Sequence, residues 1–258
     1  MPVSPIDVDS LRDKVKAMYQ AVADEPQGAF HFEMGYGLAA GLGYPTSELD
    51  QIPPEAIESF AGVGHHFALA DLQPGDHVVD LGSGSGMDAF LAARRVGDDG
   101  QVIGVDMTDA QLAKARRLAE RDGLANARFE KGYIEQVPVP DQSASVVVSN
   151  GVINLCSDKP AVFREIARIL EPGGRLAISD IVTEHQLTEA IVCDVNLWAS
   201  CIGGAMQQDD YRAAIEATGL SIHTVQENPQ YRFISDSAQG ATDTFGVKSI
   251  SVLATKRS

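Results

Sequence analysis

The sequence predicts an α/β fold in which a doubly wound, mostly parallel β-sheet is covered by helices on both faces. Between residues 76 and 182, short β-branched runs alternate with segments of helical periodicity. The strand-like runs are almost continuously apolar, as is typical of parallel strands buried on both faces. Crossovers between parallel strands are right-handed almost without exception, which leaves a doubly wound sandwich as the simplest topology for this order of elements.

Turn and capping residues delimit the elements of this region. Gly97 is expected to end the first helix and Gly123 the second, because glycine readily adopts the left-handed conformation found after helix ends. Thr108 and Gln111 have the spacing of a capping box at the start of the second helix. The predicted strands cover residues 76–81, 101–106, 127–132, 144–150 and 175–182, and the predicted helices cover 87–96, 109–122 and 159–170.

Two flanking segments complete the chain. Before the central region, apolar residues at helical spacing predict an amphipathic helix near 11–22, with Ser10 as its N-cap. After it, we predict helical segments around 188–201 and near 208–218, and strands over 220–226 and 247–255. The composition shows no linker, so we expect a single domain over 1–258, with 1–70 as an N-terminal helical extension and 71–258 as the core that carries the site.

The composition excludes several classes of protein. Of the 258 residues, 44% are hydrophobic, which is enough for a sizeable core and excludes a disordered chain or a small disulfide scaffold. Asp and Glu outnumber Lys and Arg by 36 to 20, and a net charge of −16 disfavours nucleic acid and anionic membranes as partners. We find no apolar run long enough for a membrane span and no secretion signal. Three cysteines without a C-x-x-C pair indicate a reducing compartment, so we expect a cytoplasmic protein without a bound metal.

The strongest motif is the run VVDLGSGSGMD over 78–88. A strand passes through Gly82, Gly84 and Gly86 directly into a helix, and glycines are needed where a turn is tight and a ligand must approach the backbone closely. Asp106 ends the next strand, 20 residues beyond Gly86, where a carboxylate can accept both hydroxyls of a ribose. The alternative for Asp106 is a helix cap or a surface acid.

Acidic residues on both sides of the turn decide between two kinds of nucleotide. Asp80 precedes the glycines and Asp88 follows them. Two carboxylates would repel a pyrophosphate but suit a ligand that carries an ammonium and a sulfonium group. The motif therefore favours S-adenosylmethionine over a dinucleotide such as NAD, and a dehydrogenase is the weaker interpretation.

Several longer runs resemble a known family. DLGSGSGMD (80–88), GVDM (104–107) and EPGGRLAISD (171–180) are similar to class I S-adenosylmethionine-dependent methyltransferases. The closest resemblance is to the arsenite methyltransferase family, and it covers most of residues 11–220. It is carried by VGDDGQVIGVDMT (96–108), GYIEQVPV (132–139), SNGVINLCSDKPAVFREIARIL (149–170), CIGGA (201–205) and VKAMY (15–19).

The resemblance implies both a fold and a cofactor site. The fold would be a seven-stranded, Rossmann-like sheet in which the last two predicted strands form an antiparallel hairpin, with the N-terminal helical segment as a lid. The residues that it implies for the cofactor are Asp80, Gly82, Ser83, Gly84 and Asp88 at the methionine end, Asp106 and Met107 at the ribose and adenine, and Ile134 and Glu135 beside the adenine. Asn150 would face the methyl group, and Tyr19 would close over the cofactor.

The chain departs from the family in its cysteines. In the family, thiolates hold trivalent arsenic, a soft centre that prefers soft ligands. Two of those cysteine positions are Val63 and Gly151 here, whereas Cys201 is kept. Cys156 lies five residues beyond Gly151 and is a candidate replacement. The alternative for these cysteines, and for Cys193, is that they are buried and inert.

Candidate acceptor contacts come from the positions that differ. His65 and His66 stand beside the expected acceptor pocket, where an imidazole can take a proton from an attacking atom. Their alternative role is a helix cap and a solvated side chain. The stretch Phe30, His31 and Phe32 is a candidate aromatic lid or simply a packed loop, and Trp198 is a candidate side wall of the acceptor pocket.

These observations predict an S-adenosylmethionine-dependent methyltransferase that acts on a small molecule. Two alternatives stay open. The first is an arsenite methyltransferase that uses Cys201 and Cys156, and the second is a non-catalytic protein that binds S-adenosylmethionine. We expect no nucleic-acid or membrane partner, and a homo-oligomer remains open.

Overall fold

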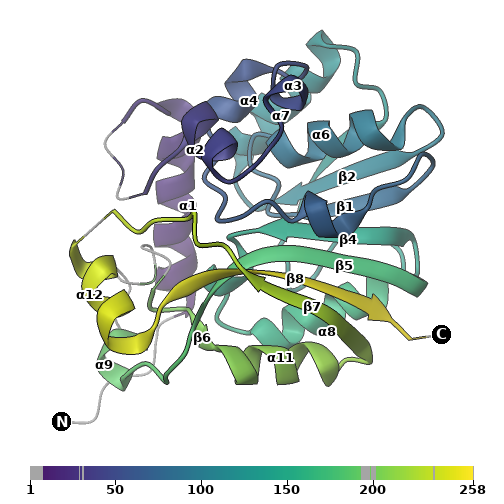
Figure 1. Cartoon of the computed structure of the whole chain (residues 1–258). Helices are drawn as coiled ribbons and strands as arrows, with labels where there is room; N and C mark the ends of the chain where they lie inside the picture. Colours follow the sequence, from purple (N-terminus) through teal and green to yellow (C-terminus); the bar gives the residue numbers. More distant parts are fainter. Residues whose placement is uncertain are drawn as a thin grey trace.

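A single mixed sheet organises the computed structural model, which describes residues 8–28, 30, 32–192, 198, 202–234 and 236–257. Seven strands run in the order β3-β2-β1-β4-β5-β8-β7, and a short eighth strand, β6, pairs with the end of β5 (Figure 1). The strands are β1 (His77–Leu81), β2 (Gln101–Asp106), β3 (Ala127–Lys131), β4 (Ala144–Asn150), β5 (Leu170–Thr183), β6 (Met206–Gln207), β7 (Leu220–Glu227) and β8 (Lys248–Lys256).

The pairing confirms a doubly wound, mostly parallel sheet. β1, β2, β3, β4 and β5 pair in parallel, and β8 runs antiparallel between β5 and β7. The seven predicted strands are therefore all present, with the expected hairpin at the end. Two details differ from the prediction. β5 starts earlier, at Leu170, and β6 was not predicted, because two residues carry too little pattern to be recognised.

Helices surround the sheet. Their bounds are α1 (Val8–Asp24), α2 (Gly35–Gly41), α3 (Thr46–Leu49), α4 (Pro54–Glu58), α5 (Phe67–Ala70), α6 (Met87–Val96), α7 (Asp109–Arg121), η1 (Ile153–Leu155), α8 (Lys159–Ile169), α9 (Glu189–Val192), α11 (Gln208–Glu216) and α12 (Asp236–Phe245). None of the described helices combines the length and the apolarity needed to cross a bilayer.

Alternate side chains of the strands supply two separate cores. Val78 and Val146 belong to the core that includes residues of α6 and α7, whereas their neighbours Val79 and Val147 belong to the core that includes residues of α8 and α11. Successive strand residues point to opposite faces, so each buried strand serves both layers. Figure 1 shows α6 and α7 on one side of the sheet and α8 and α11 on the other.

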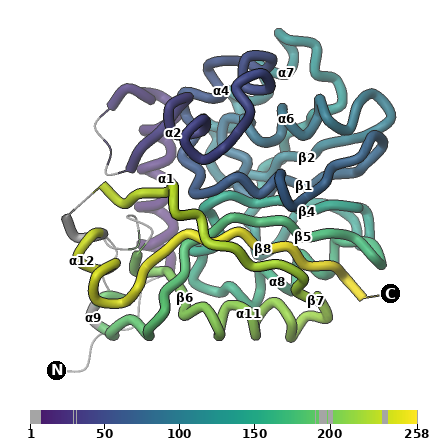
Figure 2. The backbone as a smooth tube through the Cα atoms, viewed as in Figure 1, coloured from purple at the N-terminus to yellow at the C-terminus, as the bar shows by residue number. Residues whose placement is uncertain are grey.

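The N-terminal helix α1 packs across the end of the sheet at which the parallel strands finish (Figure 1). Its residues Leu11 and Val15 share a third buried cluster with Leu155 of η1 and with Ala241 of α12. Figure 2 shows how the tube brings these distant parts of the chain to the same end of the sheet. Ligands of open parallel α/β sheets bind outside this carboxyl edge.

Three local predictions need correction or lie outside the description. α1 begins at Val8, so Ser10 lies in its first turn and is not its N-cap. The capping box is also wrong: the side chain of Thr108 caps no backbone group, and Gln111 is bound to other partners, described below. Of the helical segment predicted around 188–201, the structure describes α9, Trp198 and the residues before α9, and the rest lies outside the described residues.

Candidate cofactor and active site

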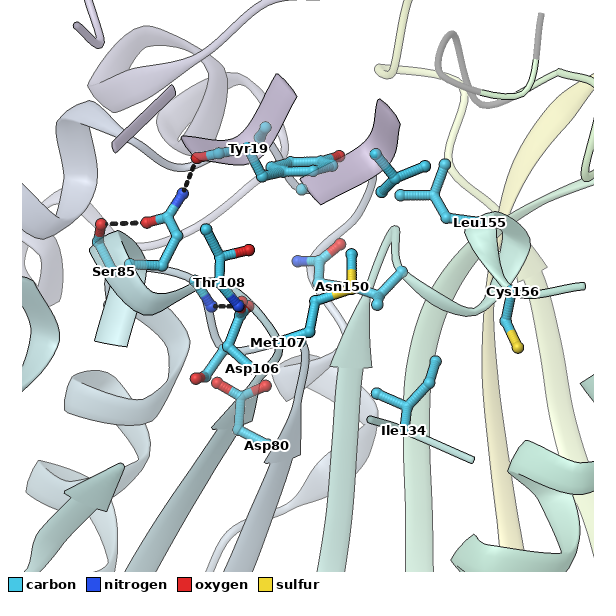
Figure 3. Close-up of a pocket in the computed structure, with 18 of the residues that line it drawn as sticks. Tyr19, Asp80, Ser85, Asp106, Met107, Thr108, Ile134, Asn150, Leu155 and Cys156 are labelled. Carbon is cyan, nitrogen blue, oxygen red and sulfur yellow. Dashed lines mark hydrogen bonds between the residues drawn. The ribbon is translucent and has the colours of Figure 1, made fainter. Parts of the chain in front are cut away.

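A pocket opens where β1, β2 and β4 end, beneath α1. Its volume is about 1140 Å³, which includes space that is open to solvent. Figure 3 shows Tyr19 of α1 on one side of this space, Asp80 and Asp106 on the other, and Asn150 between them. Of the predicted cofactor residues, all line the pocket: Asp80, Gly82, Ser83, Gly84, Asp88, Asp106, Met107, Ile134, Glu135 and Asn150.

The glycine turn forms the part of the pocket next to β1. Gly82 has φ +74° and Gly84 has φ +53°, values that side-chain-bearing residues rarely adopt. A Cβ atom on Gly82 would lie 2.4 Å from a methyl carbon of Val152, which lines the same pocket. The turn therefore brings bare backbone to the pocket surface, and at Gly82 it leaves no room for a side chain.

The carboxylate of Asp106 is held in one orientation. It accepts hydrogen bonds from the backbone N–H of Gly84, at 3.0 Å, and of Thr108, at 2.8 Å (Figure 3). Burial raises the pKa of Asp106, while these backbone donors lower it. A carboxylate has lone pairs beyond those two bonds. Asp106 thus links the glycine turn to β2 and can still accept a hydrogen bond from a ligand hydroxyl. Binding the nearby backbone N–H groups is therefore compatible with binding a ligand.

Two polar atoms at the floor of the pocket have no partner. One carboxylate oxygen (Oδ2) of Asp80 and the hydroxyl of Ser83 are buried, and neither makes a hydrogen bond within the described part of the chain. Burial, followed by the charges of Asp88 and Asp106, raises the pKa of Asp80 well above its ordinary value. Buried polar groups are seldom left unsatisfied. A ligand with a cationic N–H donor would satisfy the carboxylate.

Asn150, at the end of β4, ties the N-terminal segment to the sheet. Its side-chain oxygen accepts from the N–H of Val63 at 2.8 Å and of Gly64 at 3.3 Å. Its amide nitrogen lies 3.0 Å from the hydroxyl of Tyr44 and 3.2 Å from a carboxylate oxygen of Asp88. The Tyr44 hydroxyl donates to the other oxygen of Asp88 at 2.7 Å. Asn150 therefore has a fixed side chain at the pocket surface.

Tyr44 is the functional residue that the sequence did not reveal. It lies in a glycine- and aromatic-rich stretch before α3, where its hydroxyl could equally face solvent. Only the folded chain brings it to Asp88, 44 positions further on. No spacing or motif marks this contact.

The structure does not bring the two predicted histidine bases to the pocket surface. His66 is 0% exposed, and its Nε2 lies 4.0 Å from a carboxylate oxygen of Asp88, behind the pocket lining. Burial lowers the pKa of His66 to about 3, and that of His65 to about 4. The ring of His65 packs against Tyr44 with centroids 4.3 Å apart. The anchoring of Val63 and Gly64 by Asn150 pulls this segment inward, which is why neither histidine reaches the acceptor space.

The N-terminal helix covers the pocket through Leu11, Val15 and Tyr19. Beside them, Arg12 forms an ion pair with Glu135 at 2.9 Å. Gln111 of α7 donates from its amide nitrogen to the backbone oxygen of Tyr19 at 3.1 Å, and the hydroxyl of Ser85 bonds to its amide oxygen (Figure 3). Tyr19 thus lines the pocket from the side of α1, and its closure over a cofactor stays a prediction.

The predicted aromatic lid is partly described. The rings of Tyr19 and Phe32 stack with centroids 6.3 Å apart, and those of Phe30 and Phe32 with centroids 5.7 Å apart. Phe30 and Phe32 therefore extend the cover that Tyr19 begins, although they do not line the pocket itself. His31 lies outside the described residues.

Among the residues that the structure describes, a single cysteine lines the pocket. Cys156 lines the pocket, and burial together with nearby Glu135 raises the pKa of its thiol to about 12. The two positions at which the family has cysteines are neighbours: a Cβ on Gly151 would lie 3.1 Å from a methyl group of Val63. Cys193 and Cys201 lie outside the described residues. No group of three metal-binding side chains is found among the residues that the structure describes.

Trp198 packs behind the pocket. Its ring lies under the ammonium of Lys159, 5.2 Å from the ring centroid, and its indole N–H donates to the backbone oxygen of Val192. It shares a buried cluster with Leu155, which does line the pocket. Trp198 therefore supports the pocket wall through Leu155 and does not contribute to its surface.

Comparison with known proteins assigns the chain to a family. Residues 72–219, more than half of the chain, match the family model "Methyltransferase domain". The chain belongs to the class I S-adenosylmethionine-dependent methyltransferases. The chain is 39% identical to the arsenite methyltransferase of Halobacterium salinarum over 249 residues, which are 91% of this chain and 63% of that protein. It is 35% identical to human arsenite methyltransferase over 62% of this chain and 47% of that protein.

Solved structures agree with the sequence relatives. The arsenic(III) S-adenosylmethionine methyltransferase of Chlamydomonas reinhardtii matches with a TM-score of 0.69 and 31% identity, covering 83% of this chain and 73% of that chain. Geranyl diphosphate C-methyltransferase of Streptomyces coelicolor matches with a TM-score of 0.67 and 19% identity over 99% and 100% of the two chains, which shows a shared fold. The chain spans about half to three-fifths of the length of the curated relatives that it matches.

The residues of the pocket fit S-adenosylmethionine. The donor carries an ammonium group, a sulfonium group and ribose hydroxyls. The unpartnered oxygen of Asp80 can accept a hydrogen bond from the ammonium group, and the oriented carboxylate of Asp106 can accept from the ribose hydroxyls. The glycine turn provides the close backbone surface that a bulkier turn would block.

Proposed function

We propose that the protein transfers the methyl group of S-adenosylmethionine to a small organic acceptor. The observation that carries the proposal is the pocket beneath α1. Acidic side chains and a glycine turn line it, and Cys156 is the one cysteine among its described lining residues. The carboxylates of Asp80 and Asp106 would bind the amino-acid end and the ribose of the cofactor. Asn150, fixed by its five hydrogen-bond contacts, would border the transferred methyl group.

The protein's part in this reaction is alignment and exclusion of water. When bound, S-adenosylmethionine supplies an electrophilic methyl group on a positively charged sulfur. Leu11, Val15 and Tyr19 would shield that group from solvent and hold the acceptor in line with it. Orientation of this kind lowers barriers by roughly 7–11 kcal/mol in well-aligned systems. No base is required for an acceptor that is already nucleophilic.

The cysteine pattern argues against trivalent arsenic as the main acceptor. A thiolate set binds arsenic because soft ligands suit a soft centre. Here Val63 and Gly151 replace two family cysteines, and neither residue offers a soft ligand; a Cβ added to Gly151 would lie 3.1 Å from a methyl group of Val63. The one described thiol in the pocket, Cys156, is held protonated by its raised pKa. These observations favour an organic acceptor.

Arsenite is the second candidate, because the sequence relatives in the comparison are named arsenite methyltransferases. It would require Cys156 and Cys201, together with a thiol-bearing cosubstrate, to replace the missing ligands. If arsenite stimulates turnover of the cofactor, and Cys156→Ser and Cys201→Ser each abolish the stimulation, this candidate replaces the first.

The cofactor is tested first. Isothermal calorimetry with S-adenosylmethionine should show binding that Asp106→Ala weakens tenfold or more, because the substitution removes a ribose acceptor and releases Gly84. Asp109→Ala is the matched control, since Asp109 begins α7 only three residues away but is exposed and paired with Lys131. Absence of binding to the unchanged protein would end the proposal.

The acceptor is tested with labelled cofactor. Cell extract incubated with the protein and S-adenosylmethionine carrying an isotope-labelled methyl group should yield a labelled small molecule on mass spectrometry. Tight cofactor binding without any labelled product would favour the non-catalytic alternative. We also propose a cytoplasmic location without nucleic-acid or membrane partners, which the net charge of −16 and the three cysteines support.

A further inference from the structure

Charge is distributed unevenly around the pocket. Five charged side chains line it, and Arg12 and Glu135 pair with each other. The remaining three, Asp80, Asp88 and Asp106, are carboxyl groups, and the one cationic side chain of the described lining, Arg12, pairs with Glu135 and not with them. A pocket of this kind attracts a ligand with a net positive charge.

The reaction changes the charge of the ligand at one atom. The acceptor's electron pair forms the new bond to the methyl carbon, and the electron pair of the broken carbon–sulfur bond stays on sulfur. The sulfonium therefore becomes a neutral thioether, and any proton that the acceptor gives up passes to solvent. The ammonium, carboxylate and ribose are the same in donor and product, so only a group near sulfur can tell the two apart by charge.

Of these three carboxyl groups, Asp88 is the one that is hydrogen-bonded to Asn150. It lies in the first turn of α6, directly after the glycine turn, and one of its oxygens is 3.2 Å from the amide nitrogen of Asn150. Asn150 is the residue that the proposed function places beside the methyl group. Asp80 and Asp106, by contrast, are assigned to the ammonium and the ribose, which do not change in the reaction.

The surroundings of Asp88 hold it rigidly and leave it uncompensated. Tyr44 and Asn150 donate to its two oxygens, and these neutral donors fix the carboxylate without cancelling its charge. His66, at 4.0 Å, is buried and holds a pKa of about 3, so it is neutral near pH 7. Arg95, on the same helix, is paired with Glu48 at 2.7 Å.

We propose that Asp88 makes this pocket bind the sulfonium donor more tightly than the neutral thioether product, so that loss of the sulfur charge promotes product release. This inference rests on the proposed function, because it assumes that S-adenosylmethionine occupies the pocket. In this role, the negative charge of Asp88 distinguishes the donor from the product, whereas the contacts to the ammonium and the ribose are the same for both.

The pH dependence follows from the groups that face Asp88, namely Tyr44, Asn150, His65, His66, Asp80 and Arg95. Burial raises the pKa of Asp88 to about 6, and the bonds from Tyr44 and Asn150 oppose that rise. Asp88 is therefore ionised at pH 7.5 and largely protonated at pH 5. The preference for the donor should fall as the pH falls through this range.

The test compares S-adenosylmethionine with S-adenosylhomocysteine, its demethylated product, by calorimetry between pH 5 and pH 7.5. At pH 7.5, Asp88→Asn should lower the ratio of the product Kd to the donor Kd by at least about fivefold. The Coulomb interaction between two charges near a protein surface amounts to several kcal/mol at contact and falls with distance, so fivefold is a conservative expectation. The same ratio should fall with pH in the unchanged protein and fall less in Asp88→Asn.

Two further variants make the result decisive. Tyr44→Phe removes a donor to the carboxylate, raises the pKa of Asp88, and should move the pH at which the ratio falls upward. It serves as the test if Asp88→Asn does not fold. Asp109→Asn, exposed on α7, should leave the ratio unchanged. A ratio that is equal in the unchanged protein and Asp88→Asn, or a pH profile that Tyr44→Phe does not move, overturns the inference. If the unchanged protein binds neither ligand, the proposed cofactor itself is wrong.

Discussion

The side-chain amide of Gln111 donates a 3.1 Å hydrogen bond to the backbone oxygen of Tyr19, across 92 positions of the chain. The other end of the same amide accepts from the hydroxyl of Ser85 in the glycine turn. One side chain of α7 thus connects the covering helix α1 to the turn beneath it. The cover and the cofactor loop are coupled through Gln111.

Gln111→Ala should loosen α1. Removal of a hydrogen bond of this kind costs about 1 kcal/mol, so we expect the affinity for S-adenosylmethionine to fall by roughly fivefold. Hydrogen exchange of the α1 amides should accelerate. Gln73→Ala is the control, because Gln73 is an exposed glutamine that bonds only near its own position. Unchanged exchange in α1 would show that Gln111 does not hold the helix.

Gly82→Ala should reduce cofactor binding at least tenfold, because the new methyl group would meet Val152 at 2.4 Å and because φ is +74°. Gly97→Ala is a matched control. Gly97 has a similar φ of +67°, but a methyl group added there would meet no atom within 4 Å. Both variants should lose roughly 1–3 kcal/mol of stability from backbone strain, and Gly82→Ala should lose more because of the contact with Val152. Only Gly82→Ala should lose binding in a calorimetric titration, and equal binding in the two would contradict the role assigned to the turn.

His66 should make the fold less stable in mild acid. Its pKa is about 3 in the folded protein and about 6.5 in an unfolded chain, so the unfolded state binds more protons between these values. The contribution of His66 to the free energy of unfolding should therefore fall by about 1.4 kcal/mol for each pH unit below about 6.5. Buried carboxyl groups such as Asp88, whose pKa is raised, oppose this trend in wild type and variant alike.

The measurement is urea unfolding of the wild type and His66→Asn at pH 7 and pH 5. The wild type should lose about 2 kcal/mol more than the variant over this interval. His77→Asn, at the exposed start of β1, serves as the control and should keep the wild-type slope. Parallel slopes for the wild type and His66→Asn would show that His66 gains solvent or a partner before the protein unfolds.

Tyr211→Phe should destabilise the protein by about 1–3 kcal/mol, because it leaves one oxygen of the buried Asp180 carboxyl group without a donor, while the other keeps the N–H groups of Asn154 and Ile181. The Tyr211 hydroxyl donates to Asp180 at 2.7 Å, and both residues are buried. Tyr36→Phe makes the same chemical change at an exposed tyrosine that donates to Asp50. Thermal unfolding should show a lower Tm for Tyr211→Phe and little change for Tyr36→Phe. A similar small shift in both would mean that Asp180 finds another donor.

The sequence predicted the sheet well for a simple physical reason. Runs such as 101–106 and 144–150 have β-branched apolar residues at their centres, which favour a strand over a helix or a loop. The glycine turn and Asp106 were equally clear, because the glycines and the acid must follow particular strands to meet at one edge of a parallel sheet. Local pattern and tertiary arrangement agree at these positions.

The predictions from the sequence were wrong where a side chain could bind either a neighbour in the sequence or a residue far away in it. The pair Thr108 and Gln111 has the spacing of a capping box, yet Gln111 bonds to Ser85 and Tyr19 instead. His66 looked like an accessible base, but its segment is drawn against β4 by Asn150. Neither outcome has a signature in neighbouring residues, because both depend on chain segments that meet only after folding.

The place of β8 in the sheet has a consequence for synthesis on the ribosome. This strand lies between β5 and β7, yet its residues 248–256 are translated after both. Until they emerge, the facing edges of β5 and β7 lack the strand that will pair with both of them. Such edges invite pairing with other chains. The newborn polypeptide therefore passes through a vulnerable interval that ends only when β8 is inserted, and chaperone dependence should be greatest there.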